Sequence, residues 1–109
     1  MQAGKLRKRI TIQQSVITRD EYGAEIKTWT TFISGWGSVE PLRGREYLEA
    51  RQLQADIDMR IRMRVQKNKR PLPGMRVIYD ERTLEIISVI EVNEAGRELQ
   101  LMCREQIEG

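Results

Sequence analysis

The sequence has 109 residues and a formal net charge of +3, from 19 basic and 16 acidic side chains. This length predicts a single domain, residues 1–109, with one modest core. A compact monomer of this size has a radius of gyration of about 13 Å. The near-balance of charge argues against a protein dedicated to coating nucleic acid or a membrane surface. No apolar run approaches the ~20 residues that span a bilayer, so we expect no membrane-bound or exported form.

Side chains that support catalysis or bind metals are scarce. The sequence has no histidine and one cysteine, Cys103, so it lacks the commonest general base and cannot form an internal disulfide. A lone cysteine is typical of a cytosolic chain and predicts a small apolar core residue. The acidic pairs fall on predicted turns or on an exposed helix, where solvated charge is the ordinary role. The sequence therefore predicts no enzymatic activity, no metal and no cofactor.

An antiparallel hairpin is predicted in the N-terminal third. Residues 6–14 and 25–32 alternate apolar and polar side chains, the period of a strand with one buried face. Residues 18–23 between them carry turn-forming aspartate and glycine. A separate short strand is predicted at residues 35–40, where glycines flank a tryptophan. Trp29, on the return strand, is interpreted either as a cap on the core or as a contact residue.

The clearest strand pattern lies at residues 57–65, where every odd position is apolar and every even position is charged. Three of the charged residues are Arg60, Arg62 and Arg64. A helix would scatter these arginines around its circumference, so the pattern predicts a strand with one buried face and one basic face. Two interpretations of the basic face remain open. It keeps an exposed strand soluble, or it faces a partner.

The remaining segments complete a mainly β prediction. Residues 44–54 contain good helix formers and predict one short helix or a long, partly helical loop. A basic, proline-containing loop at residues 66–74 precedes three more predicted strands, at residues 75–79, 83–92 and 97–104. Short strands joined by short turns favour a small antiparallel β-barrel or sandwich of about six to eight strands.

Several short motifs follow one another along nearly the whole chain. They are Gly4-x-Leu6-x-x-Arg9-Ile10, Asp20-x-Tyr22-Gly23, Trp29, Trp36-x-x-Val39-x-x-Leu42-x-Gly44-x-Glu46, Arg64, Met75-Arg76-Val77-x-Tyr79 and Leu99-x-Leu101-x-Cys103. No single motif is specific, but the ordered set resembles the head–tail joining family of tailed bacteriophages. The sequence departs from the family pattern at Gly37, where alanine is usual, and at Asp58-Met59, where threonine–histidine is frequent.

The resemblance implies a structural virion connector. Such a head-completion protein would form a homo-oligomeric ring between the portal and the tail, where phage DNA passes without sequence-specific binding. It would assemble in the bacterial cytoplasm, from a phage or prophage gene. A long inter-strand loop of the family is associated with closing the DNA channel, and residues 41–55 form the longest excursion here. Either this loop lines the channel or its helix merely covers the mouth of the barrel. The candidate channel residues are Leu42, Gly44, Glu46, Tyr47 and Leu48.

A ring would also give the basic face a partner. Arginine forks suit carboxylates, so Arg60, Arg62 and Arg64 are predicted to contact a neighbouring subunit. Exposed ion pairs contribute only about 0–1 kcal/mol each, so aromatic residues such as Trp29 would provide most of the affinity and the free protein would associate weakly. The candidate carboxylates are Glu40, Glu46 and Glu49.

The alternative function is a small β-barrel module that binds nucleic acid, which requires a basic groove with stacking aromatic side chains. Only 6% of the residues are aromatic. We expect Tyr22, Trp29, Phe32 and Trp36 to be used mostly by turns and the core, so the connector is the favoured prediction.

Overall fold

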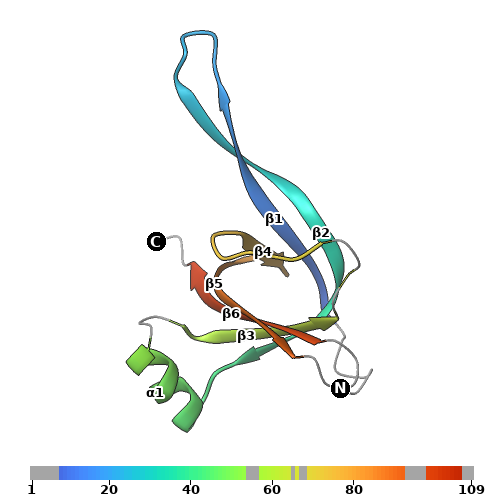
Figure 1. The fold of residues 1–109 in the computed structure, drawn as a ribbon, viewed down its shortest axis with the longest axis vertical. Coiled ribbons are helices and arrows are strands. Elements are labelled where there is room, and N and C mark those ends of the chain that lie inside the picture. The colour runs from blue at the N-terminus through green and yellow to red at the C-terminus, as the bar shows by residue number, and fades with distance from the viewer. Residues whose placement is uncertain (1–7, 54–56, 65, 67–68, 93–97, 107–109) are drawn as a thin grey trace.

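In the part of the chain that the structure describes, six strands form one antiparallel sheet that closes into a barrel, and a single helix joins two of them (Figure 1). The computed structural model describes residues 8–53, 57–64, 66, 69–92 and 98–106. Predictions for residues 6–7, for part of the basic loop and for the turn at 93–96 lie outside this range. The elements are β1 (Lys8–Arg19), β2 (Glu25–Pro41), α1 (Gly44–Leu53), β3 (Met59–Arg64), β4 (Arg76–Tyr79), β5 (Arg82–Val92) and β6 (Glu98–Gln106).

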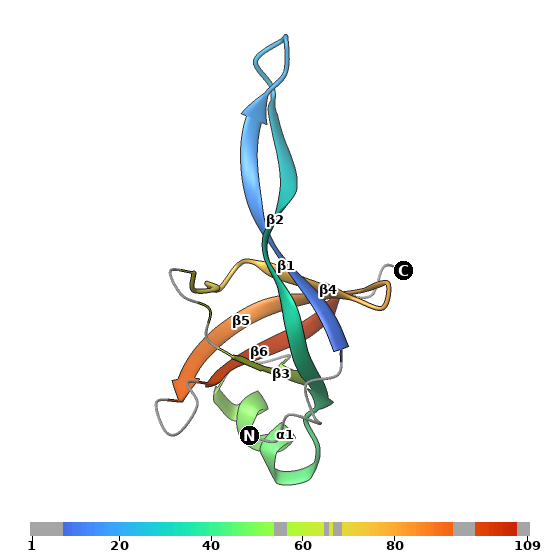
Figure 2. The ribbon, with the colours of Figure 1, turned by 90° about the vertical axis from the view of Figure 1, so that its right-hand side faces the viewer.

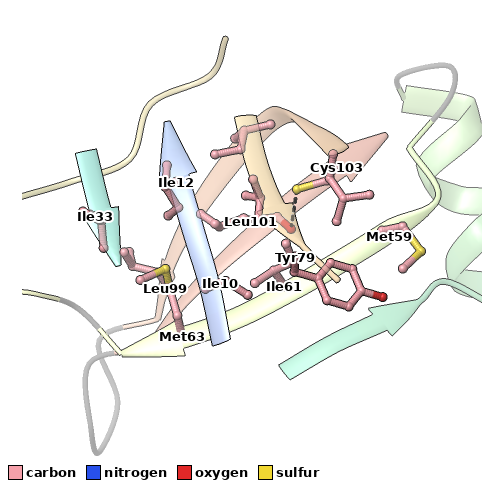
Figure 3. Close-up of a cluster of buried hydrophobic side chains, with 13 residues drawn as sticks. Ile10, Ile12, Ile33, Met59, Ile61, Met63, Tyr79, Leu99, Leu101 and Cys103 are labelled. Carbon is pink, nitrogen blue, oxygen red and sulfur yellow. Dashed lines mark hydrogen bonds between the residues drawn. The ribbon is translucent and has the colours of Figure 1, made fainter. Parts of the chain in front are cut away.

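This arrangement confirms the predicted mainly β fold with one short helix. Around the barrel the strands follow the order β1-β2-β3-β6-β5-β4, and β1 pairs with β4 to close it. The predicted alternation is confirmed in β3, where Met59, Ile61 and Met63 are buried while the arginines between them face outward. Leu101 and Cys103 of β6 are fully buried opposite them (Figure 3).

The β1–β2 hairpin extends far beyond the barrel (Figure 2). β1 pairs with β4 only at Thr11–Gln13, and β2 pairs with β3 only from Gly37 onward, so residues 14–30 pair only with each other. We call residues 14–30 the arm. The arm stretches the molecule to 50 × 32 × 24 Å and gives a radius of gyration of 15.1 Å. The expected value of about 13 Å is therefore too small, because that scaling describes a compact chain.

One bulge interrupts the alternation of β2, which the sequence pattern had divided into two strands. Ile12 pairs with Ile33 and Gln13 with Thr31, which leaves Phe32 as an extra residue in β2. The bulge changes which parity of β2 faces inward, and Ile33 rather than Phe32 takes the fully buried position. Two predicted strands, residues 25–32 and 35–40, are therefore one continuous strand. The Lys69 ammonium donates a hydrogen bond to the Phe32 carbonyl at 3.0 Å.

The Gly37→Ala variant is expected to be less stable, although alanine is usual here in the resembling family. A Cβ atom at this position would lie 2.9 Å from the Arg62 carbonyl oxygen and 3.1 Å from Ile10 Cδ1. Because the backbone oxygen belongs to the neighbouring strand, the sheet itself has to move, at a cost of about 1–3 kcal/mol. Urea denaturation followed by tryptophan fluorescence measures this loss. Gly74→Ala is a poor control because Gly74 has a φ of 95°, so Ala24→Gly in the exposed turn is preferable. An unchanged midpoint would contradict the close approach.

Cys103 is expected to resist thiol reagents in the folded protein. Its side chain is fully buried, and burial raises the pKa of the thiol to about 12. At pH 8 the reactive thiolate is then on the order of one molecule in ten thousand. Reaction with a chromogenic disulfide should follow global unfolding, with complete modification only in denaturant. Rapid labelling under native conditions would show that β6 opens locally.

Candidate functional site

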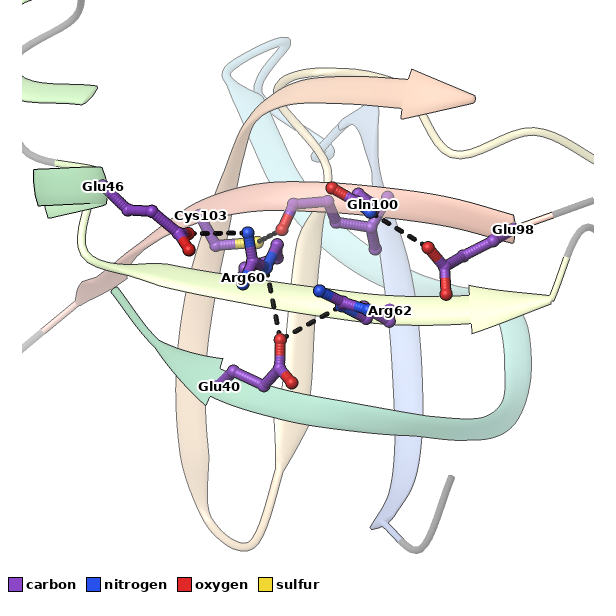
Figure 4. Close-up of polar contacts among 8 residues, drawn as sticks. Glu40, Glu46, Arg60, Arg62, Glu98, Gln100 and Cys103 are labelled. Carbon is purple, nitrogen blue, oxygen red and sulfur yellow. Dashed lines mark hydrogen bonds and ion pairs between the residues drawn. The ribbon is translucent and has the colours of Figure 1, made fainter. Parts of the chain in front are cut away.

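Arg60 connects the helix to the barrel (Figure 4). Its Nε donates to Glu40 Oε1 of β2 at 3.2 Å, and its Nη1 donates to Glu46 Oε2 of α1 at 2.7 Å. The Arg60 side chain is only 18% exposed and its contact with Glu40 is partly buried, whereas Glu46 is 56% exposed and the contact on its side is open to water. Arg60 is thus the residue that joins three elements, and its two carboxylate partners lie in its own chain.

The other arginines of β3 differ from Arg60 in their surroundings. Arg62 Nε lies 3.1 Å from Glu40 Oε1, which Arg60 already uses, and it makes no hydrogen bond there. The hydroxyl of Ser38, the cross-strand partner of Arg62, is also buried without a hydrogen bond among the described residues. Arg64 and Glu49 are exposed. The contacts of these residues with a second subunit stay a prediction.

The candidate channel residues lie just before α1 and in its first half. Leu42 is buried, and its N–H donates to the carbonyl of Asp58 at 2.9 Å, which fixes the start of the excursion. Gly44 has a φ of 58°, a left-handed conformation that favours glycine. Tyr47 is half-buried, whereas Leu48 is 62% exposed. The predicted helix is therefore present at the rim of the barrel, with one apolar side chain directed to solvent.

The aromatic residues are more exposed than the sequence suggested. Trp29 lies outside the core between two cations, with Arg76 Cζ 4.2 Å and Lys27 Nζ 4.9 Å from its ring centre. Tyr22 at the tip of the arm is 87% exposed, and Trp36 is 55% exposed. The expectation that turns and the core would use most of these rings is wrong for Tyr22 and Trp36. Two sequence features could have indicated this exposure: the glycines on either side of Trp36 and the charged residues around Tyr22.

A further ion pair links β5 and β6 and gives a pH prediction. Arg82 Nε and Nη2 donate to the two carboxylate oxygens of Glu105 at 2.8 and 2.5 Å, and this hydrogen bonding lowers the pKa of Glu105. A lowered folded-state pKa contributes stability above the unfolded pKa, and this is lost as pH falls through the folded value. Glu105→Gln should therefore cost about 1 kcal/mol or less at pH 7. The difference from wild type in urea denaturation should shrink below about pH 4.5. A difference independent of pH would contradict this origin.

The structure describes few features of a reaction centre. No three histidine, cysteine, aspartate or glutamate side chains come close enough to hold a metal ion within the described ranges. Among the same residues, no helix is long and apolar enough to cross a membrane. Instead, the exposed features of the described residues are the rim helix, Arg64 at the end of β3 and the arm.

The chain belongs to the phage head completion protein family, whose model matches residues 1–106. It is 26% identical over 107 residues to head completion protein gp7 of Enterobacteria phage HK97, covering 95% of this chain and 96% of that protein. The solution structure of protein SF1141 from Shigella flexneri 2a is similar over 100% of both chains, with 30% identity and a TM-score of 0.80. A chain from the virion of a native gene transfer agent particle shares the fold, with 19% identity, a TM-score of 0.63, and coverage of 94% and 96%.

Family membership confirms the resemblance seen in the sequence. It supports a role for the chain as a structural component of the phage virion at the connection between head and tail.

Proposed function

We propose that copies of this chain form a ring between the portal and the tail, with α1 and residues 41–55 facing the DNA channel. The ring would join the head to the tail and close the channel after packaging, without sequence-specific contacts to DNA. Assembly would take place in the bacterial cytoplasm from phage or prophage genes. In this role the chain makes contacts only and catalyses no reaction.

The observation that carries the proposal is the position of α1. The helix has 10 residues, and isolated helices shorter than ~12–15 residues are marginal in water. Its Leu48 is exposed, and the Arg60–Glu46 ion pair links it to the barrel. A short helix at the rim with an uncovered leucine is best explained by packing in an assembly.

In this proposal the charged residues around β3 divide into those that hold α1 and those that face a neighbouring subunit. Arg60 and Glu46 hold α1 against its own barrel, while Arg62, Arg64 and Glu49 face a neighbouring subunit together with Trp29. Ion pairs of this kind set orientation and register, since each exposed pair contributes only about 0–1 kcal/mol. The free protein would therefore associate weakly, and the ring would be stable mainly in contact with portal and tail proteins.

Particles that depend on this chain test the proposal. Wild-type chain supplied to particles lacking it should restore nuclease-protected DNA, and electron microscopy should show a ring below the portal. Leu48→Asp should lower the amount of protected DNA, because it puts a charge on the exposed side of α1.

The matched control is Leu72→Asp. Leu72 is 57% exposed, close to the 62% of Leu48, and lies in the loop before β4. It should leave the protected DNA unchanged. Wild-type particles without a ring would overturn the proposal, and a ring that retains DNA normally with Leu48→Asp would overturn the assignment of α1 to the channel.

A further inference from the structure

The two ends of β1 carry surfaces of opposite charge. One is the acidic tip of the arm, residues 19–25. The other is a basic surface at the start of β1, which we call the Trp36 patch. The Trp36 patch consists of Arg9, Trp36 and Arg64.

The acidic tip is a rigid turn with excess negative charge. It has three carboxylates, on Asp20, Glu21 and Glu25, against the single guanidinium of Arg19. Asp20 Oδ1 accepts the N–H groups of Tyr22 and Ala24 at 2.8 and 2.9 Å, which fixes the turn. Arg19 lies 3.7 Å from Glu25, so the charges of this pair offset each other. Glu21 and the almost fully exposed Tyr22 stand at the end of the arm.

The Trp36 patch is formed by three neighbouring strands. Arg9 of β1 pairs with Trp36 of β2, and its guanidinium lies 5.6 Å from the ring centre. Met63 of β3 pairs with Gly37, so Arg64 is at the next position of the sheet beside Trp36. Glu98 is opposite Arg64 and already accepts a hydrogen bond from Gln100 at 2.9 Å. The patch therefore combines a half-exposed indole with excess positive charge.

The two surfaces cannot meet within one chain. β1 runs from Lys8 to Arg19 over 12 residues, which at about 3.3 Å per residue separates its ends by about 35 Å. The arm points away from the barrel along the longest dimension of the molecule (Figure 1). A contact between the two surfaces is therefore possible only between molecules.

We propose that the acidic tip of one copy docks on the Trp36 patch of the next copy. The inference rests on the proposed ring and names the contact that builds it. Because the two surfaces differ, the contact is head-to-tail, and it gives a closed ring when the rotation between copies closes. Tyr22 would pack against Trp36 while Glu21 faces Arg9 and Arg64. The aromatic pair supplies contact area, and the charges select the orientation.

A charge exchange tests the contact in the full-length protein. Glu21→Arg reverses the tip and Arg64→Glu reverses the patch, and both residues are exposed. Each variant alone should self-associate about fivefold or more weakly than wild type at low salt, near 0.05 M, since one exposed pair changes from attraction to repulsion. Sedimentation velocity at high protein concentration measures the association.

The decisive sample is the mixture of the two variants. The reversed tip of the Glu21→Arg chain then meets the reversed patch of the Arg64→Glu chain. The native tip of the Arg64→Glu chain meets the native patch of the Glu21→Arg chain. Association in the mixture should return to within about twofold of wild type, and so should that of the double variant Glu21→Arg/Arg64→Glu. The matched control is Glu81→Arg, an equal charge reversal at the exposed β4–β5 turn, which should have no effect.

Cysteine trapping provides a second measurement, which reports which residues come together in the complex. Chains with Glu21→Cys and chains with Arg64→Cys should form a mixed disulfide faster than chains with Glu81→Cys and Arg64→Cys. The native Cys103 is buried and should not compete. Equal rates of the two mixed disulfides would overturn the docking.

Other outcomes separate this inference from the proposed function. Rings that assemble normally in particles with Glu21→Arg would overturn the docking and leave the ring intact. Wild-type particles without a ring would overturn both. Tight binding of duplex DNA that Arg64→Glu abolishes and Glu21→Arg does not affect would identify the Trp36 patch as a phosphate-binding surface instead.

Discussion

Leu101→Ala is expected to lower the free energy of unfolding by about 2–5 kcal/mol, the range for deleting a buried leucine side chain and leaving a cavity. Leu101 is fully buried on β6, where it pairs with Ile61 of β3 and Val89 of β5. Domains of this size are usually stable by only about 5–15 kcal/mol, so the variant should be partly unfolded at 37 °C. Urea denaturation monitored by far-UV circular dichroism gives the difference.

Leu72→Ala is the control, because the same atoms are removed from a side chain that is 57% exposed. It should change the stability by less than about 0.5 kcal/mol. Similar losses for the two leucines would show that the β6 side chains do not form the centre of the core.

Arg60→Met is expected to release α1 from the barrel and to destabilise the protein by about 1–3 kcal/mol. Methionine preserves much of the apolar stem of Arg60 but leaves Glu46 without its partner and Glu40 with Arg62 alone. Loss of one member of a partly buried charged network costs more than loss of an exposed pair. Trypsin should cut at Arg43 or Arg45 at least about tenfold faster than in wild type, because cleavage follows local opening.

Arg64→Met provides the comparison for stability and proteolysis. It removes an exposed arginine from the same face of β3, and it should leave cleavage near α1 unchanged. Equal protection of α1 in Arg60→Met and wild type would mean that Leu42 and Tyr47 hold the helix without the ion pair.

The parts of the fold that follow from local patterns were predictable. Alternation in residues 57–65 specifies both the strand and its buried side, since adjacent side chains on a strand point to opposite faces. The helix at residues 44–53 matched its prediction because good helix formers follow Pro41, which ends β2. Pairings between distant strands, such as β1 with β4, could not be predicted, because alternation does not specify the neighbour.

The arm was missed for a related physical reason. Residues 14–19 do not alternate, because Val16 and Ile17 are adjacent. A break in alternation does not show whether the strand ends or continues outside the barrel. The single extra residue at Phe32 also reverses the parity that the sequence suggested for β2. Among the candidate residues, Arg60, Glu40 and Glu46 come together in the structure, but the sequence could not show that they meet within one chain.

The way in which the barrel closes has a consequence for translation. The acidic tip is formed by neighbouring residues, so it can fold soon after roughly the first 30 residues leave the ribosome, and synthesis of that length takes about 2–6 seconds. The Trp36 patch lies on β1, β2 and β3, and β3 gains its second neighbour only when β6, the last strand made, pairs with it. Under the docking proposed above, a truncated chain would present a tip but no acceptor. Such a fragment would occupy the end of a growing ring and stop its extension.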